Sequence, residues 1–139
     1  MKEATLDGQQ PTVEDVMAVA EFRAALRQFQ RRSERVARQC GLTPQRHLLL
    51  VMIKGSPDGE EQSTVTELSE RLQLAQSTVT ELVHRAEEAG LIEREQSQRD
   101  ARVAYLRLTD EGERRLMLSF TGLATERANL RDAFAHFGD

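Results

Sequence analysis

Apolar and small side chains recur along the first third of the chain at the spacing of one helix face: Val16, Val19, Phe22, Leu26, Phe29, Ser33, Val36 and Cys40. The steps are three or four residues, close to the 3.5-residue period of a helical seam. The pattern predicts a helix that begins at Thr12 or Asp15, runs to about Gln39 and stops at Gly41. At ~1.5 Å per residue this helix is roughly 40 Å long. Since one small domain needs less, we expect the seam to be a subunit interface.

A short, nearly continuous apolar run comes next. Thr43 is suited to cap a helix and Pro44 to be its first residue. The sequence HLLLVMI that follows is apolar nearly all round, so we expect a buried helix that Gly55 ends. Residues 56–62 are acidic and rich in turn formers, which predicts a linker.

Two short amphipathic segments follow, joined by residues 73–75. Thr64 and Glu67 have the spacing of a capping box, which marks the start of the first helix. Apolar residues at helical spacing give each segment an inner face: Val65, Leu68 and Leu72 in the first, and Val79, Leu82, Val83 and Ala86 in the second. Such a pair predicts a helix-turn-helix, or alternatively a surface helix with a solvated polar face. The second helix has short polar side chains near its start, which suits entry into a DNA groove.

A hairpin is predicted directly after these helices. Residues 91–94 and 103–108 are strand-like, and the sequence EQSQRDAR between them is polar. Arg99 and Arg102 lie near the expected tip, where guanidinium groups suit the negative potential of a narrow minor groove. Asp100 beside them makes sense if it holds an arginine by bidentate pairing.

The C-terminal segment repeats the pattern of the first helix. After Thr109, a suitable N-cap, apolar residues recur at helical spacing: Leu116, Phe120, Leu123, Leu130, Phe134 and Phe137. They predict a second long seam with a bend at Gly122, formed by one long helix or two short ones.

These elements together resemble the winged helix-turn-helix of MarR-family transcription regulators. The matching sequences occur in the family's order and spacing: TELSERL, STVTELV, EEAGLIER, the wing signature Asp100-Ala101-Arg102, and LTDEG from Leu108. LTPQRHLLLVMIKG resembles the family's buried second helix, so the likeness covers roughly residues 15–120. Ala75 departs from the serine of many relatives. The recognition helix could therefore start later, at Ser77 or Thr78.

The expected fold is mainly α with a small β-hairpin wing (α+β), a winged helix-turn-helix with long N- and C-terminal dimerisation helices. By length we expect a single domain. Its parts are expected over these ranges: 1–139 for the domain, 12–40 and 109–137 for the dimerisation helices, and 43–108 for the DNA-binding lobe.

The resemblance implies a homodimer on double-stranded DNA, acting as a repressor at a pseudo-palindromic operator with half-sites about one turn (~10 bp) apart. Candidate contacts in the recognition helix are Gln76, Ser77, Thr80 and His84 for base edges, and Thr78 and Arg85 for phosphates. Candidate contacts in the wing are Arg99 and Arg102, with Asp100 orienting Arg102. Glu81 could accept from cytosine N4, but we favour a pair with Arg85.

The family commonly senses small anionic aromatic molecules between its dimer helices and its DNA lobe. Candidate residues for such an effector pocket are Phe22, Leu26, Phe29, Arg46, His47 and Val51, all of which could instead be ordinary core or surface residues. Residues 21–46 carry a local charge of +5, which is either a solvated face or a contact for phosphates or an anionic effector. The net charge of −4 means that a DNA site must be local.

Composition excludes several other classes. No phosphate loop, metal motif or nucleophile elbow is present, so we expect no enzyme and no cofactor. His47, His84 and His136 are too scattered for a metal site. The polar start indicates no signal peptide, and no apolar stretch could cross a membrane, so we expect a cytoplasmic protein. Cys40 could be a small apolar residue, a redox sensor, a cross-link or a metal ligand. The main alternative function is a winged-helix module that binds protein and has lost DNA binding.

Overall fold

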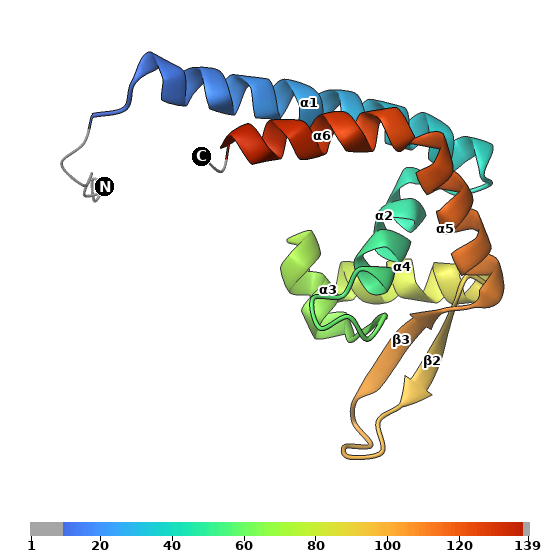
Figure 1. The fold of residues 1–139 in the computed structure, drawn as a ribbon. Coiled ribbons are helices and arrows are strands. Elements are labelled where there is room, and N and C mark those ends of the chain that lie inside the picture. The colour runs from blue at the N-terminus through green and yellow to red at the C-terminus, as the bar shows by residue number, and fades with distance from the viewer. Residues whose placement is uncertain (1–9, 138–139) are drawn as a thin grey trace. The chain divides into compact units, whose positions relative to one another are not determined.

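The computed structural model describes residues 10–137 and contains six helices and three strands within that range. In chain order they are α1 (Val13–Gln39), α2 (Pro44–Lys54), β1 (Gln62–Ser63), α3 (Val65–Leu72), α4 (Gln76–Glu88), β2 (Ile92–Gln96), β3 (Ala104–Leu108), α5 (Asp110–Gly122) and α6 (Ala124–Phe137). Figure 1 labels all of them except β1. The expectation about a signal peptide concerns residues 1–9, which lie outside the described residues. None of the described helices is long and apolar enough to cross a membrane.

The chain divides into two compact units. The first contains the chain up to Arg32 together with the segment from Ala124 onward, and the second contains Ser33–Leu123. The boundary therefore falls within α1 and again between α5 and α6. The mainly helical fold with a winged helix-turn-helix agrees with expectation, whereas the ranges assigned to a single domain and its parts stay predictions.

In the first unit, α1 and α6 lie side by side (Figure 1). The ring centroid of Phe22 is 6.2 Å from that of Phe134 and 5.3 Å from that of Phe137. Arg32 forms an ion pair with Glu126 at 3.5 Å. The N- and C-terminal helices are therefore in contact with each other within one chain.

The first helix begins and ends where local signals predict. The backbone N–H of Thr12 donates to Asp15 Oδ2 at 2.7 Å, and the N–H of Asp15 donates to Thr12 Oγ1 at 3.2 Å. This reciprocal cap satisfies two N–H groups that the helix leaves open. At the other end Gly41 adopts a φ of 73°, the left-handed conformation that glycine takes without penalty. Cys40 beside it is half-buried.

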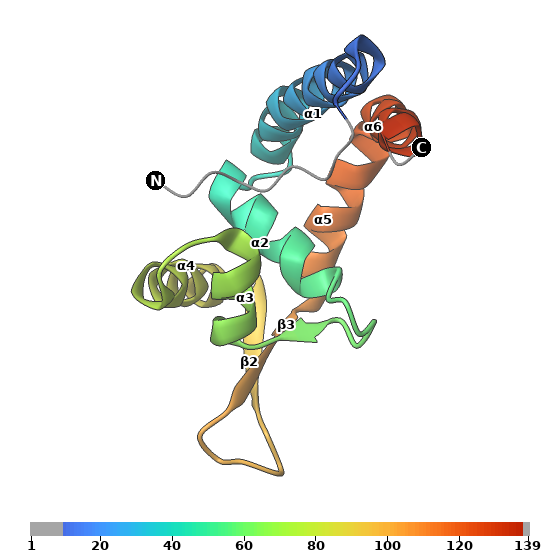
Figure 2. The same ribbon diagram turned by 90° about the vertical axis from the view of Figure 1, so that its left-hand side faces the viewer.

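The second unit is organised around α2, which contacts α3, α4, α5 and the sheet (Figure 2). Leu49, Leu50 and Ile53 are fully buried there. The prediction that α2 is buried nearly all round is wrong at Leu48, which is 46% exposed. The elements of this unit cover α2 from several sides but leave the side that bears Leu48 open.

The sheet contains a strand that the sequence did not predict. Its order is β1-β3-β2, and both pairs are antiparallel. Gln62 and Ser63, at the end of the expected linker, pair with Arg107 and Leu106 of β3. Two polar residues carry no alternating apolar pattern, so pairing with β3 alone makes them a strand. The wing strands themselves agree with prediction to within two residues.

The C-terminal segment forms two helices rather than one. Leu123 separates α5 from α6 and is fully buried. Gly122 lies so close to α1 that a Cβ there would be 3.1 Å from Cγ1 of Val36. The helix is interrupted at the predicted position, directly after the residue that packs closely against α1.

Candidate nucleic-acid interface

The recognition helix α4 starts without a side-chain cap. Its N-cap is Ala75, so the alternative starts at Ser77 or Thr78 are wrong. The preceding link decides the start. Gln73 adopts a φ of 56° and ends α3, and the hydroxyl of Ser69 donates to the carbonyl of Leu74 at 2.6 Å. This hydrogen bond and the left-handed conformation of Gln73 fix the backbone of the link, so that the next helix begins at Gln76.

The exposed face of α4 gathers the predicted recognition residues. Val79, Val83 and Ala86 are buried against the rest of the unit. Opposite them, the following side chains are all exposed: Gln76, Ser77, Thr78, Thr80, Glu81, His84 and Arg85. The structure thus brings every predicted recognition-helix residue to the outer side of one helix. Sequence reasoning missed Thr66 of α3, whose hydroxyl accepts from Gln76 Nε2 at 3.4 Å.

Two pairs of polar side chains occupy this exposed face. Arg85 Nε donates to Glu81 Oε1 at 3.0 Å, which is the favoured pairing of Glu81. His84 Nε2 lies 2.6 Å from Glu88 Oε1. Each pair joins residues one helical turn apart and is well exposed, so it contributes little to stability. A contact between DNA and Arg85 or His84 would therefore exchange one anionic partner for another.

The wing tip carries the expected bidentate pair. Arg102 Nε and a terminal nitrogen donate to the two oxygens of Asp100 at 3.1 and 3.2 Å. The Arg102 side chain also lowers the pKa of Asp100, so the carboxylate remains charged. Arg102 is 89% exposed, so its guanidinium is oriented while it remains open to a ligand.

The loop that bears this pair is internally bonded. The hydroxyl of Ser97 accepts from the backbone N–H groups of Arg99 and Asp100, both at 3.2 Å. Gln96 Nε2 donates to the carbonyl of Ala101. These bonds fix the backbone of the loop between β2 and β3, which bears Arg99 and Arg102.

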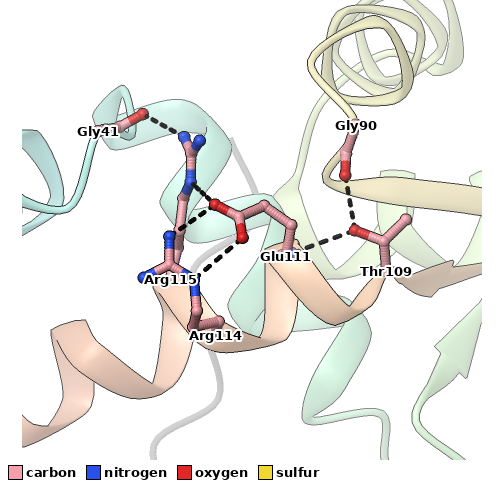
Figure 3. Close-up of polar contacts among 7 residues, drawn as sticks. Gly41, Gly90, Thr109, Glu111, Arg114 and Arg115 are labelled. Atoms are coloured by element: carbon pink, nitrogen blue, oxygen red, sulfur yellow. Dashed lines mark hydrogen bonds and ion pairs between the residues drawn. The ribbon is translucent and has the colours of Figure 1, made fainter.

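The start of α5 connects two turns of the same unit (Figure 3). Glu111 accepts from Arg114 at 2.7 and 3.0 Å and from Arg115 at 2.8 Å. Arg115 also donates to the carbonyl of Gly41 at 3.1 Å, and the hydroxyl of Thr109 donates to the carbonyl of Gly90 at 2.6 Å. The hydrogen bonds that Glu111 accepts, chiefly from Arg114 and secondly from Arg115, lower its pKa to about 2. The root of the wing is therefore tied to α5, and α5 to the end of α1.

The geometry of α3, α4 and the wing agrees with a known family. Residues 41–103 match the sequence model of the MarR family. Residues 41–103 of this chain belong to the MarR family. The resemblance carried by the D-x-R wing signature and the phrase EEAGLIER is thereby confirmed.

Solved structures show the same fold over most of the chain. Wild-type MarR from E. coli is 16% identical with a TM-score of 0.66, and the alignment covers 91% of this chain and 86% of that one. Sco3205 from Streptomyces coelicolor, a MarR-family regulator solved in complex with DNA, is 24% identical with a TM-score of 0.60, covering 91% and 77%. The transcriptional regulator Tm0710 from Thermotoga maritima is 26% identical with a TM-score of 0.61, covering 84% and 78%. Comparison with curated protein sequences gives no match.

The MarR family consists of DNA-binding transcription regulators, and its regulators are not enzymes. The expected class, a regulator rather than an enzyme, is therefore supported by the family that residues 41–103 match. The individual DNA contacts, from Gln76 to Arg85 in α4 and from Arg99 to Arg102 in the wing, stay predictions.

The six residues of the expected effector pocket fall in two units. Phe22, Leu26 and Phe29 belong to the first unit, where Phe22 packs against the rings of α6. Arg46, His47 and Val51 lie on α2 in the second. Their common role in a MarR-family effector pocket stays a prediction.

His47 is the one of these residues with a defined polar environment. It is 5% exposed, and its Nε2 lies 2.8 Å from the hydroxyl of Ser119, which donates to the carbonyl of Leu116 at 2.6 Å. Nε2 must therefore carry the proton. Nδ1 then accepts from the hydroxyl of Ser33 at 3.3 Å. Both ring nitrogens have partners in the neutral form, and burial lowers the pKa of His47.

The buried histidine predicts a loss of stability in mild acid. Because its pKa is lower in the folded state than the usual value of about 6.5, the unfolded state takes up the proton first. The free energy of unfolding should fall as the pH decreases from about 7 to about 5, and His47→Gln should flatten this dependence. Denaturant unfolding at a series of pH values measures it.

Glu111 provides the control for this titration. Its lowered pKa gives stability that is present above about pH 4.5 and is lost as the pH falls towards 2. Glu111→Gln should therefore alter the strongly acidic range and leave the change between pH 7 and 5 in place. A His47→Gln variant with the wild-type slope in that range would contradict the role of His47.

Proposed function

We propose that this chain is a DNA-binding transcription regulator that acts as a homodimer, represses transcription and recognises a pseudo-palindromic operator. The observation that carries the proposal is one unit that combines a polar, exposed recognition helix with a wing whose Arg102 is oriented by Asp100. The match of residues 41–103 to the MarR-family model and the fold shared with Sco3205, which was solved with DNA, support it.

The recognition helix α4 would enter the major groove of double-stranded DNA. The proposed base-edge contacts are Gln76, Ser77, Thr80 and His84, and the proposed phosphate contacts are Thr78 and Arg85. The wing would enter the flanking minor groove with Arg102, oriented by Asp100, and with Arg99 nearby. A net charge of −4 supports a local contact rather than a generally basic surface.

The homodimer is supported by apolar side chains that the single chain leaves exposed. In the first unit they are Val13 (70%), Val16 (63%), Met17 (61%), Val19 (41%), Phe134 (62%) and Phe137 (47%). Exposed apolar residues gathered on two adjacent helices are typical of an interaction surface. A second copy would cover them and would supply the second half of a two-fold operator contact. A small anionic or aromatic effector that releases the DNA, and a cytoplasmic location, belong to the same proposal.

Arg102→Ala is the direct test. It should weaken binding of the chain's operator by more than about 1 kcal/mol, roughly fivefold, because one charged minor-groove contact is lost. The slope of log affinity against log salt should also decrease by about one. The operator is obtained by selecting bound duplexes from a random-sequence DNA pool, and affinity is measured by fluorescence anisotropy.

Arg131→Ala controls for the charge that this test removes. Arg131 is an exposed arginine of α6, so its replacement changes the net charge equally without altering the wing. It should weaken DNA binding much less, and both variants should keep the wild-type molecular mass in light scattering. If the wild-type chain selects no duplex even at low salt, the alternative of a protein-binding module would be favoured.

A further inference from the structure

The recognition helix and the wing are joined by a very short connection. Helix α4 ends at Glu88, Gly90 adopts a φ of 75°, and β2 starts at Ile92. The N–H of Leu91 donates back to the carbonyl of Ala86 at 3.0 Å. The angle between α4 and the wing therefore depends in part on the few residues of this junction.

The backbone of the junction is held from α5. Thr109 bonds the carbonyl of Gly90 through its hydroxyl, and its N–H donates to the carbonyl of Leu91 at 3.0 Å. Gly112 lies directly against the same carbonyl of Leu91. These contacts fix the position of the junction. Because they all act on Gly90 and Leu91, they do little to fix the direction in which the strands leave the junction.

An ion pair across the junction can fix this direction, because it joins α4 to a residue further along β2. Arg94 Nε lies 3.0 Å from each oxygen of Glu87, so the last turn of α4 is bonded to the third residue of β2. The Glu87 side chain is 25% exposed and that of Arg94 46%, so the pair is partly shielded from water. The pair therefore connects the end of α4 to the start of the wing at a second point, away from the junction, and so restrains the angle between them.

Small errors at this junction are magnified at the wing tip. At ~3.3 Å per residue, the strand from Leu91 to Ser97 is a lever of roughly 20 Å. A rotation of about 10° at the junction would move its end by about 3.5 Å, using that same rise per residue. This is more than a hydrogen bond tolerates. An arginine at the tip would then miss its groove while the recognition helix remained correctly seated.

We propose that Glu87 and Arg94 are positioning residues, which set the angle between α4 and the wing so that Arg102 reaches the minor groove when α4 occupies the major groove. The proposal rests on the proposed DNA-binding function and assigns the pair no contact with DNA. The carboxylate of Glu87 acts by holding Arg94 and thereby the wing, although the negative charge by itself would repel DNA.

A double-mutant cycle tests the proposal on the full-length protein and its selected operator duplex. Glu87→Gln should weaken binding about fivefold, the upper end for an ion pair at this exposure. Removal of a negative charge would by itself tighten DNA binding, so the expected direction separates positioning from general electrostatics. In the Arg102→Ala background, Glu87→Gln should have almost no further effect, because the contact that it positions is already absent.

Two further variants make the test specific. Glu93→Gln removes the same charge from an exposed side chain of β2 without altering the Glu87–Arg94 pair, so it should not weaken binding, and its effect should be the same with or without Arg102. Exchange of the pair, with Glu87→Arg and Arg94→Glu together, should restore binding to within about twofold of wild type, since the swapped ion pair has equal net charge.

The outcomes are distinguishable. Weakened binding by Glu87→Gln that disappears in the Arg102→Ala background supports the proposal. Unchanged or tighter binding by Glu87→Gln, or an equal loss in both backgrounds, overturns it while leaving the proposed function intact. A wild-type chain that selects no duplex would overturn the proposed function and this inference together.

Discussion

Replacement of Gly112 by alanine is expected to lower the free energy of unfolding by about 3 kcal/mol, the upper range for a side chain forced into an occupied space. A Cβ at this position would overlap the carbonyl oxygen of Leu91, which is backbone and cannot rotate away. Helix α5 or the wing root would have to shift. Because that shift breaks the contacts of Thr109 with Gly90 and Leu91, operator binding should be lost as well.

Gly90→Ala is the matched control for this substitution. Gly90 has a φ of 75°, but no atom lies within 4 Å of the position of a Cβ, so the substitution adds backbone strain without a collision. That strain costs about 1–2 kcal/mol. Denaturant unfolding of the two variants and the wild type, at one protein concentration, compares them. A Gly112→Ala variant no less stable than Gly90→Ala would contradict the close approach of α5 to Leu91.

The second large effect is expected at Leu49 in the middle of α2. Its side chain is fully buried in the core of the second unit, so Leu49→Ala should lower the free energy of unfolding by about 3 to 4 kcal/mol through lost burial and a remaining cavity. The neighbouring Leu48 is 46% exposed in the single chain, and Leu48→Ala should cost less than about 1 kcal/mol.

Adjacent leucines on one helix make this comparison independent of helix propensity, because the two substitutions are chemically identical. Urea unfolding at a fixed protein concentration measures both, which matters when the protein self-associates. Equal losses at the two positions would mean that the side of α2 bearing Leu48 is covered in solution.

Local signals in the sequence proved dependable for the ends of helices. The capping box of Thr64 and Glu67 is present, with reciprocal bonds of 3.0 and 3.1 Å. Thr43 accepts from the N–H of Arg46 at 3.1 Å, and Gly41 adopts the left-handed conformation. Each of these features depends on residues within one helical turn, so the sequence displays it directly.

The start of α4 shows where such local reasoning fails. Ser77 and Thr78 are better caps than Ala75, yet the helix begins at Gln76. The hydrogen bond from Ser69 to the carbonyl of Leu74 fixes the backbone of the preceding link. This fixed backbone, and not the best capping side chain, determines the first residue of the helix. A cap contributes about 1 kcal/mol, which the geometry of a packed helix-turn-helix readily outweighs.

The candidate site divides in the same way. The sequence alone indicated the outer face of α4 and the pair of Asp100 and Arg102, because a helical period and a two-residue spacing are visible in one dimension. It did not indicate the pair of Glu87 and Arg94. These residues lie on opposite sides of a turn between a helix and a strand, and neither periodicity relates them.

By itself, the sequence determined the class of this protein: a helix-turn-helix with a wing, flanked by two apolar seams, in the order of the MarR family. Only the tertiary structure decided which side of α2 is covered, that Gln62 and Ser63 form a third strand, and that Glu87 is bonded to Arg94 across the root of the wing. The physical reason is the range of the interactions. Caps, turns and helical faces arise between residues that are close in the sequence. Burial, strand pairing and the angle of the wing depend on contacts between residues that are far apart in the sequence.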